Sequence, residues 1–137
     1  MSLGSTFIYK TFTKFDQTYN ILVAEYTGRP DRATTSYETI RKLLEYYNAK
    51  TLYENQVKGL KGYFEQKKCL YLLKEQPAIL ADMVKKSNVQ RGYGIHMTAG
   101  IKSQCEIYAR DWLLEERGER KDGSKILNLH TIMSIPL

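Results

Sequence analysis

An acidic side chain at the end of a short apolar run is the first feature of this sequence that could do chemistry. The run Lys50-Thr51-Leu52-Tyr53-Glu54 is typical of a β-strand and ends on a carboxylate. In open α/β sheets, ligands bind in the crevice at the carboxyl ends of parallel strands. Glu54 is therefore a candidate site residue, and the alternative interpretation is a solvated carboxylate at the start of a loop.

A second candidate is the segment 88–98, where an arginine, two glycines and a histidine follow one another closely. Glycine lets backbone amides approach an anion, and Arg91 adds positive charge, so Arg91, Gly92 and Gly94 are candidates for contact with a phosphate backbone. The alternative is a surface connection without a ligand. His96 has no neighbour at metal-ligand spacing and by itself indicates no site.

The other acids and the cysteines add no recognisable motif. Glu25 follows a strand pattern, and it lies either toward a crevice or at a strand edge near solvent. Cys69 and Cys105 are far apart, with no Cys or His nearby at the spacing of a zinc site. We interpret both cysteines as reduced core residues.

Composition limits the class of protein. The chain has 137 residues, 42% of them hydrophobic and 26% charged, which is typical of a single globular domain over 1–137. Its formal charge of +6 favours approach to a polyanion such as DNA. No apolar run approaches the ~20 residues that span a bilayer, and no secretory signal is present at the N-terminus. We therefore expect a cytoplasmic protein with no membrane partner.

The elements that must position these residues alternate between strand and helix. Two β-rich runs, Ser5–Phe12 and Tyr19–Thr27, predict a hairpin. A helix follows, with hydroxyl caps at 34–36 and its end near Asn48. Its apolar positions have the spacing of a buried stripe: Ile40, Leu43, Leu44 and Tyr47. With the strand at 50–54 next, the order predicts a mixed α/β fold.

The rest of the chain continues this alternation. Asn55 can cap a further helix, in which Gly59 and Gly62 imply close packing or the close approach of a ligand. The later patterns predict a strand at Cys69–Leu73, a helix after Pro77, a long core helix at Ala99–Glu116, a charged mobile loop at Gly118–Lys125 and a short strand at Ile126–Leu129.

The succession of these motifs resembles the C-terminal nuclease domain of phage terminase large subunits, the ribonuclease H-like nucleases of DNA-packaging motors. The resemblance covers nearly the whole chain. It rests on the hairpin and capped helix together with Leu52-Tyr53-Glu54, Gly59, Gly94-Ile95-His96-Met97-Thr98 and Leu127-Asn128-Leu129-His130.

The resemblance implies a ribonuclease H-like mixed sheet with flanking helices. It makes Glu54 the family's second catalytic acid and a ligand of Mg²⁺ or Mn²⁺, with Gly59 matching the glycine that follows that acid. The activity implied is cleavage of concatemeric double-stranded DNA. The partners implied are double-stranded DNA, the portal and the small terminase subunit.

The sequence also departs from the family. The family's first catalytic Asp precedes the hairpin and its last Asp follows the final strand, so we expect an incomplete fold that lacks the first strand and the last helix. A two-metal site needs several carboxylates around ions about 3.5–4 Å apart, and Glu54 alone does not supply them. We expect the fragment to be inactive in isolation and its unpaired strand edges to favour a homodimer.

Two functional interpretations therefore remain open. The chain is either a fragment of a metal-dependent endonuclease or a non-catalytic basic module, DNA-binding or structural, with the same fold. In both, salt-sensitive DNA binding is expected through Arg91 and Lys102.

Overall fold

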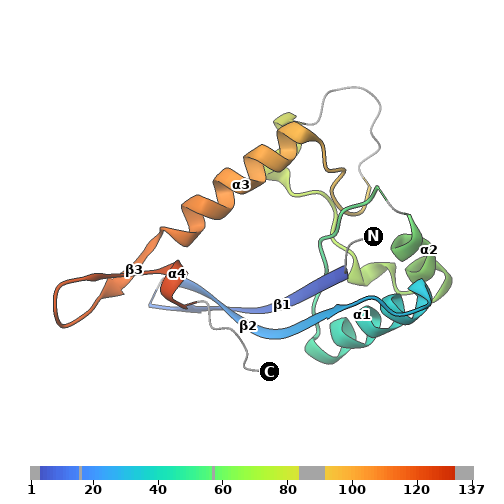
Figure 1. Ribbon diagram of the computed structural model, residues 1–137, viewed down its shortest axis with the longest axis horizontal. Helices are drawn as coiled ribbons and strands as arrows, with labels where there is room; N and C mark the ends of the chain where they lie inside the picture. The colour runs from blue at the N-terminus through green and yellow to red at the C-terminus, as the bar shows by residue number, and fades with distance from the viewer. Residues whose placement is uncertain (1–3, 16, 57, 84–91, 132–137) are drawn as a thin grey trace. The chain divides into compact units, whose positions relative to one another are not determined.

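The computed structural model describes residues 4–15, 17–56, 58–83 and 92–131 (Figure 1). The chain divides into two compact units, one of Met1–Gly4 with Gly28–Lys102 and one of Ser5–Thr27 with Ser103–Leu137. The described residues form two small antiparallel sheets and four α-helices, which confirms the mixed α/β class. The ribonuclease H-like sheet and the single domain over 1–137 stay predictions.

The elements in chain order are β1 (Gly4–Lys14), β2 (Gln17–Gly28), α1 (Ala33–Tyr47), α2 (Gly59–Gln66), the 3₁₀ helices η1 (Leu70–Leu72) and η2 (Ala78–Met83), α3 (Ala99–Leu113), β3 (Glu116–Glu119), β4 (Lys125–Leu127) and α4 (Asn128–Thr131). Within the described parts of the chain, no helix is long and apolar enough to cross a membrane.

The predicted hairpin is confirmed as β1 and β2, which pair with each other. Cross-strand contacts show how they align: the rings of Phe12 and Tyr19 stack with centroids 5.3 Å apart. Beside them, the Thr11 hydroxyl donates to Asn20 Oδ1 over 2.8 Å. Both pairs join residues equally far from the turn, as an antiparallel register requires.

Helix α1 is confirmed, but its predicted hydroxyl caps are wrong. The helix begins at Ala33, and the residue before it, Arg32, makes no side-chain cap. The hydroxyl residues at 34–36 therefore lie inside the first turn, where their side chains are not in the capping position. The C-terminal end is as expected, because Asn48 adopts the left-handed conformation (φ 50°) that ends many helices.

The core of the first unit lies between α1, α2 and η1. It is a cluster of buried residues: Leu44, Leu60, Phe64, Cys69, Leu72 and Leu73. Phe64 is fully buried. The buried position of Cys69 matches its interpretation as a core residue, whereas Cys105 is only half-buried; both thiols are free.

Gly59 allows α2 to pack against α1. A Cβ atom at Gly59 would lie 2.3 Å from the hydroxyl oxygen of Tyr37, a distance that no side chain tolerates without movement. The close packing expected of this glycine is confirmed. Gly62 has no atom within 4 Å of its Cβ position, so packing does not require a glycine there.

The strand predicted at Cys69–Leu73 is wrong. Leu70–Leu72 form a 3₁₀ turn instead, after α2 ends at Gln66 and Lys68 takes a positive φ of 58°. A short apolar run is compatible with a buried strand or a buried helical turn, and periodicity does not separate the two. The turn places Leu72 and Leu73 in one cluster, whereas successive residues of a strand face opposite sides.

In the second unit, the charged loop predicted at Gly118–Lys125 is confirmed only in its middle, because 120–124 form the turn of a hairpin while its two ends belong to strands β3 and β4. Strands β3 and β4 pair antiparallel, with Glu119 opposite Lys125 and a bulge beside Gly118. The Asp122 carboxylate accepts hydrogen bonds from the backbone amide (2.9 Å) and the hydroxyl (2.6 Å) of Ser124. These bonds order the turn. The strand predicted at Ile126–Leu129 ends at Leu127, where α4 follows.

Helix α3 exists where it was predicted, but it is not a core helix. Of its residues only Ile101 is buried, while Ile107 and Tyr108 are 47% and 37% exposed. The helical spacing of the apolar residues identified the helix correctly. Those residues become buried only where another element packs against them along the whole stripe. The helix starts after Thr98, whose Oγ1 accepts from the Ile101 amide over 3.2 Å.

Candidate functional site

The segment from Thr51 to Asn55 lies at the centre of the first unit and contacts two other extended segments. On one side, the Thr51 amide donates to the Leu72 carbonyl and the Lys74 amide donates to the Thr51 carbonyl, each over 2.8 Å. These bonds form an isolated parallel bridge between Thr51 and Leu73.

The other neighbour of this segment is the stretch that contains His96. The Ile95 amide donates to the Tyr53 carbonyl over 2.7 Å, and the Asn55 amide donates to the Ile95 carbonyl over 2.9 Å. Glu54 and Ile95 thus form a second isolated parallel bridge. The strand predicted at 50–54 is not continuous, because only Thr51 and Glu54, near its two ends, form bridges. Both bridges are parallel, as expected for a strand of an α/β sheet.

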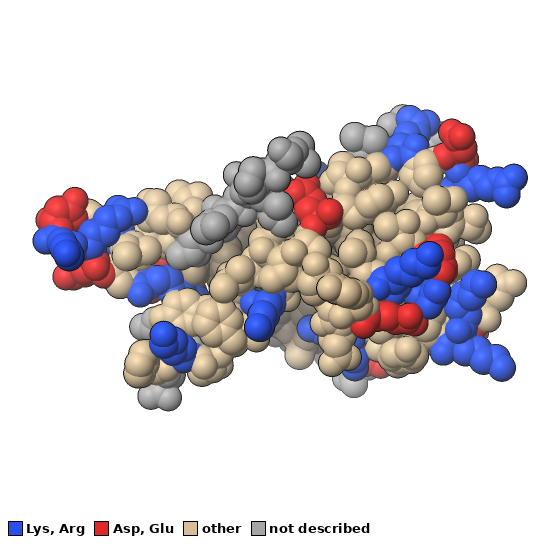
Figure 2. All heavy atoms as spheres, turned by 90° about the horizontal axis from the view of Figure 1, so that it is seen from below, with Lys and Arg blue, Asp and Glu red and all other residues tan. Residues whose placement is uncertain are grey.

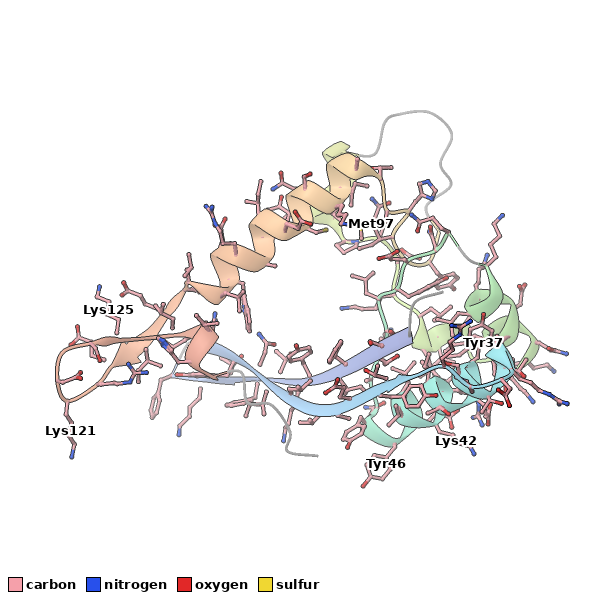
Figure 3. The ribbon with its side chains drawn as sticks, viewed as in Figure 1. Tyr37, Lys42, Tyr46, Met97, Lys121 and Lys125 are labelled. Atoms are coloured by element: carbon pink, nitrogen blue, oxygen red, sulfur yellow. The ribbon has the colours of Figure 1, made fainter. Side chains whose placement is uncertain are left out.

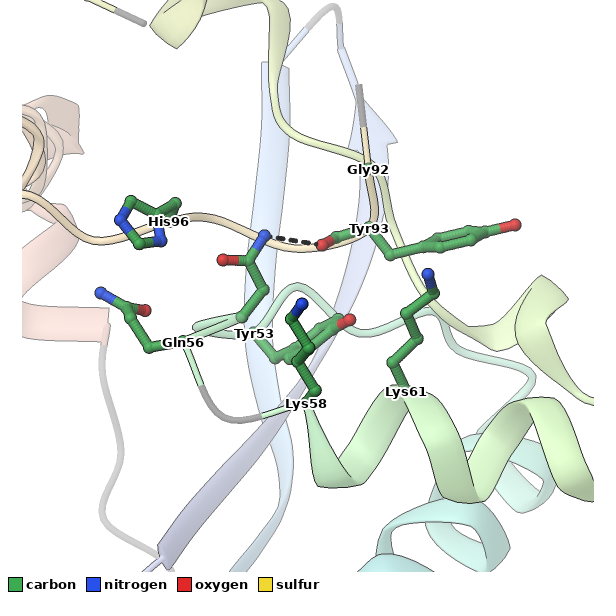
Figure 4. A pocket seen from close by; sticks show the side chains of 8 residues that line it. Tyr53, Gln56, Lys58, Lys61, Gly92, Tyr93 and His96 are labelled. Atoms are coloured by element: carbon green, nitrogen blue, oxygen red, sulfur yellow. Dashed lines mark hydrogen bonds between the residues drawn. The ribbon is translucent and has the colours of Figure 1, made fainter. Parts of the chain in front are cut away.

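A pocket of about 440 Å³ opens beside this bridge, within the first unit (Figure 4). Aromatic rings, lysines and amides make up most of its described lining: Tyr53, Asn55, Gln56, Lys58, Lys61, Gly92, Tyr93 and His96. The pocket has two walls. Residues from Tyr53 to Lys61 form one wall, and residues from Gly92 to His96 form the other.

Two side-chain amides hold these walls together. Asn55 Nδ2 donates to the Tyr93 carbonyl over 3.0 Å, a bond drawn in Figure 4. Gln56 Nε2 donates to the Met97 carbonyl over 2.7 Å. Because each amide joins residues distant in sequence, the two walls are fixed relative to one another and the pocket is preformed.

The aromatic and basic side chains of the pocket are close to each other. The ammonium of Lys61 lies 6.0 Å from the centre of the Tyr93 ring, within the range of a cation–π contact. Burial, and to a smaller extent the proximity of Tyr93, raises the pKa of the Tyr53 phenol above its ordinary value of 10.0. Tyr53 therefore remains a neutral hydroxyl at physiological pH.

Gly94 shapes the pocket through its backbone. Its φ of 78° lies in the left-handed region, and a Cβ there would be 2.7 Å from the Tyr53 carbonyl oxygen and 3.0 Å from the Tyr53 ring. Only glycine permits this approach without strain. The Gly94 amide donates to the Lys74 carbonyl over 2.8 Å, so this amide is already used within the chain.

The structure brings together some of the residues predicted from sequence. Gly92 and His96 line the pocket, and Gly94 supports it. Glu54 is exposed and is absent from the described lining, although both of its neighbours contribute to it. In an extended segment successive side chains point to opposite faces, which accounts for this difference. Lys102 is exposed on α3 and outside the lining, and Arg91 falls outside the described residues.

Sequence reasoning missed most of the pocket. Tyr53, Lys58, Lys61 and Tyr93 were not identified as site residues, and neither were the two bridging amides. The available signal was the spacing of Lys58 and Lys61, three residues apart at the start of a helix and thus on one face. Their proximity to Tyr93 depends on the bridge at Glu54, which no local pattern encodes.

The metal site implied by the resemblance is not assembled from the described residues alone. Among them, no three His, Cys, Asp or Glu side chains gather in a way that could hold an ion. A divalent ion of this kind needs several oxygen ligands, and here Glu54 would provide one carboxylate.

Comparison with protein families, curated proteins and solved structures gave no match to this chain.

Proposed function

We propose that this chain is part of the DNA-cleaving nuclease domain of a phage terminase large subunit, and that its pocket binds the sugar–phosphate backbone of DNA. The observation that carries the proposal is the parallel bridge between Glu54 and Ile95. It joins two of the stretches whose order carries the family resemblance, Leu52-Tyr53-Glu54 and Gly94 to Thr98, although they are far apart in sequence. The portal and the small terminase subunit are the protein partners that this function implies.

The chemistry of the pocket supports contact with a phosphodiester. Lys58 and Lys61 supply ammonium groups, His96 supplies ring nitrogens, and no carboxylate is found among the described lining residues. Lysine contacts to phosphate release counterions, and they account for most sequence-independent affinity for DNA. On the face drawn in Figure 2, basic side chains are interspersed with acidic ones. The local grouping in the pocket is therefore a better guide to DNA binding than the net charge of +6.

Titration of a labelled DNA duplex at low and moderate salt tests this proposal. The double variant Lys58→Ala/Lys61→Ala should weaken binding and reduce the slope of log affinity against log salt by about 2, since each lost phosphate contact removes about one unit. The control Lys42→Ala/Lys121→Ala removes the same charge from two exposed lysines that are not among the lining residues of the pocket (Figure 3). An equal effect of both double variants would contradict a specific role of the pocket.

Cleavage by this chain alone is not expected, because Glu54 would be a single carboxylate ligand. Plasmid nicking in Mn²⁺ measures this. Robust nicking that disappears in Glu54→Gln would show that unrecognised acids complete a site within the chain.

A second candidate function is a non-catalytic nucleic-acid-binding module. The observation that favours it is the pocket lining, in which lysines, tyrosines and amides occur without a carboxylate among the described residues. The full-length protein with Glu54→Gln separates the two candidates. If Glu54→Gln abolishes nicking and retains DNA binding, the nuclease function is supported. If the variant nicks DNA as before, or if the unmodified full-length protein does not nick DNA at all, the non-catalytic binding function is supported.

A further inference from the structure

We infer that the pocket accepts an unpaired nucleotide of a DNA strand, with the base stacked on Tyr93 and the adjoining phosphate bound by Lys58 and Lys61. This inference rests on the proposed DNA binding and adds the form of DNA that is recognised. Its basis is a preformed cavity in which aromatic surface and positive charge occur together.

Tyr93 is suited to serve as the stacking platform because its backbone is fixed while its ring lines the cavity. Its carbonyl accepts from Asn55 Nδ2 over 3.0 Å, and the residue pairs with Glu75 in an antiparallel bridge. A ring held in this way loses little conformational freedom when a base stacks on it. Stacking of one base on an aromatic side chain contributes about 1–3 kcal/mol and is tolerant of sequence.

Tyr53 is less available for stacking, since it forms the floor of the cavity. The backbone of Gly94 packs against its ring, as the 3.0 Å distance from a Cβ at that position shows. Both Tyr53 and Tyr93 pack against the core cluster of the first unit, so the close approach of Gly94 to the Tyr53 ring is what distinguishes the two tyrosines. We therefore assign Tyr53 a supporting position and Tyr93 the contact with the base.

The two lysines place positive charge where a phosphate attached to that base would lie. Lys61 is 6.0 Å from the centre of the Tyr93 ring, near the outer limit of a cation–π contact. An ammonium held so loosely is readily exchanged to a phosphate oxygen, for which its attraction is stronger. Figure 4 shows Lys58, just before α2, and Lys61, on α2, on the Tyr53 and Tyr93 side of the pocket, with Gln56 and His96 on the other side.

An intact duplex cannot use the aromatic part of this site. Its bases are stacked on one another, and its outer surface presents phosphates and sugars to a binding protein. A base reaches a pocket only when the strand is single or the nucleotide is turned out of the helix. The volume of about 440 Å³ is within the range of small-ligand pockets, which suits one nucleotide better than a duplex.

Anisotropy titrations with three labelled probes test the inference: a short oligothymidine, an abasic strand of equal length, and a duplex with the same total number of phosphates. The abasic strand keeps the phosphates and removes the bases. The unmodified protein should bind oligothymidine several-fold more tightly than the abasic strand. Equal affinity for the two strands would overturn the inference, and this comparison needs no variant.

Variants then assign the effect to Tyr93. Tyr93→Leu should weaken oligothymidine binding by about 5- to 150-fold, the equivalent of one stacked base, and leave abasic binding unchanged. Tyr93→Phe should retain the wild-type preference, because the ring remains. The control Tyr46→Leu removes a ring that is 82% exposed on α1, and should change neither affinity (Figure 3).

The outcomes also separate this inference from the proposed function. If the preference for oligothymidine survives in Tyr93→Leu, stacking on Tyr93 is wrong. If both strands and the duplex bind equally and all weaken in Lys58→Ala/Lys61→Ala, backbone binding stands and the unpaired-base inference fails. If no probe binds at low salt, both fail.

Discussion

Glu38 accepts hydrogen bonds from side chains on two helices. Arg41, one turn later on α1, donates through Nε over 2.9 Å and also through Nη2, while the Tyr63 hydroxyl of α2 donates over 2.5 Å. The same guanidinium reaches Glu45 over 2.9 Å. These contacts connect α1 and α2 beside the buried cluster, and they favour the ionised form of Glu38. The hydrogen bond from Arg41, then that from Tyr63, lowers the pKa of Glu38 from 4.5 to about 2.

Stability should therefore fall in acid. A carboxylate whose pKa is lower in the folded state contributes stability that is fully present above its unfolded pKa and is lost as the pH falls through the folded value. For Glu38 this interval runs from about pH 4.5 down to about 2. Urea denaturation at several pH values should show a smaller decline across this interval in Glu38→Gln than in the wild type. Glu65→Gln, at an exposed carboxylate on α2, is the control and should retain the wild-type decline.

Gly94 and Gly62 form a natural pair for testing why a glycine is present. Gly94→Ala should destabilise the protein by about 1–3 kcal/mol, because a side chain is strained at a φ of 78° and would also meet the Tyr53 carbonyl. Gly62→Ala lies in α2 with open space around it, and should stabilise by up to about 1 kcal/mol. Thermal unfolding of both variants measures this. Equal effects in the same direction would contradict the role given to Gly94 in shaping the pocket.

At the scale of elements, the sequence predicted those that rest on a long, regular period. The two strands of the first hairpin, α1 and α3 span 11 to 15 residues each, and all lie where alternation or helical spacing indicated. Short elements were not predictable in this way. The apolar run that forms the 3₁₀ turn at Leu70–Leu72 packs into the core cluster, and tertiary contacts of this kind override local propensity. The β3–β4 hairpin is local, but its strands of 4 and 3 residues are too short to show a clear period.

The candidate site was predictable only in part for the same reason. Gly92 and His96 stood out as unusual residues in a loop, and Glu54 stood out as an acid at a strand end. The tyrosines and lysines of the pocket are common surface or core residues, and apart from the spacing of Lys58 and Lys61 nothing in their own segments distinguishes them. The bridge of Glu54 with Ile95 brings them together, and it is a long-range contact.

Asn128 is a buried polar residue that links three elements of the second unit. Its side chain is 4% exposed, donates from Nδ2 to the Trp112 carbonyl over 2.7 Å and accepts from Arg117 Nε over 2.7 Å. It thereby ties the end of α3 to β3 and the start of α4. Removing one partner from a buried hydrogen bond leaves the other unsatisfied.

Asn128→Ala should therefore destabilise the protein by about 1–3 kcal/mol. In Asn128→Ala, amide hydrogen exchange should accelerate relative to the wild type, and this acceleration should be larger in β3 and β4 than in α1. The control Lys121→Ala, at an exposed position of the same hairpin, should change stability by no more than about 0.5 kcal/mol. Wild-type exchange rates in the Asn128 variant would show that the hairpin is held by its own turn.

At the scale of the whole molecule, the sheets that the structure describes are small. Each consists of two strands, so every described strand has one described neighbour in its sheet. β1 and β2 are 11 and 12 residues long, well above the usual strand length of about 5–6 residues. Exposed apolar side chains lie along them, among which Phe7, Tyr9 and Ile21 are each about half exposed. Long apolar edges of this kind favour pairing with another chain.

We therefore expect this polypeptide to form a homodimer through the β1–β2 hairpin, since an isologous pair is the commonest way to close such an edge. Light scattering across the micromolar range should give a mass that rises from monomer to dimer with concentration. Phe7→Lys/Tyr9→Lys should shift the equilibrium toward the monomer, because lysine on an edge strand opposes pairing. The control Tyr46→Leu/Tyr71→Leu replaces two exposed rings outside the hairpin and should leave the dimer intact. A monomer at all concentrations would show that the open edges are protected within the chain, which would also contradict the expectation that a sheet strand is missing.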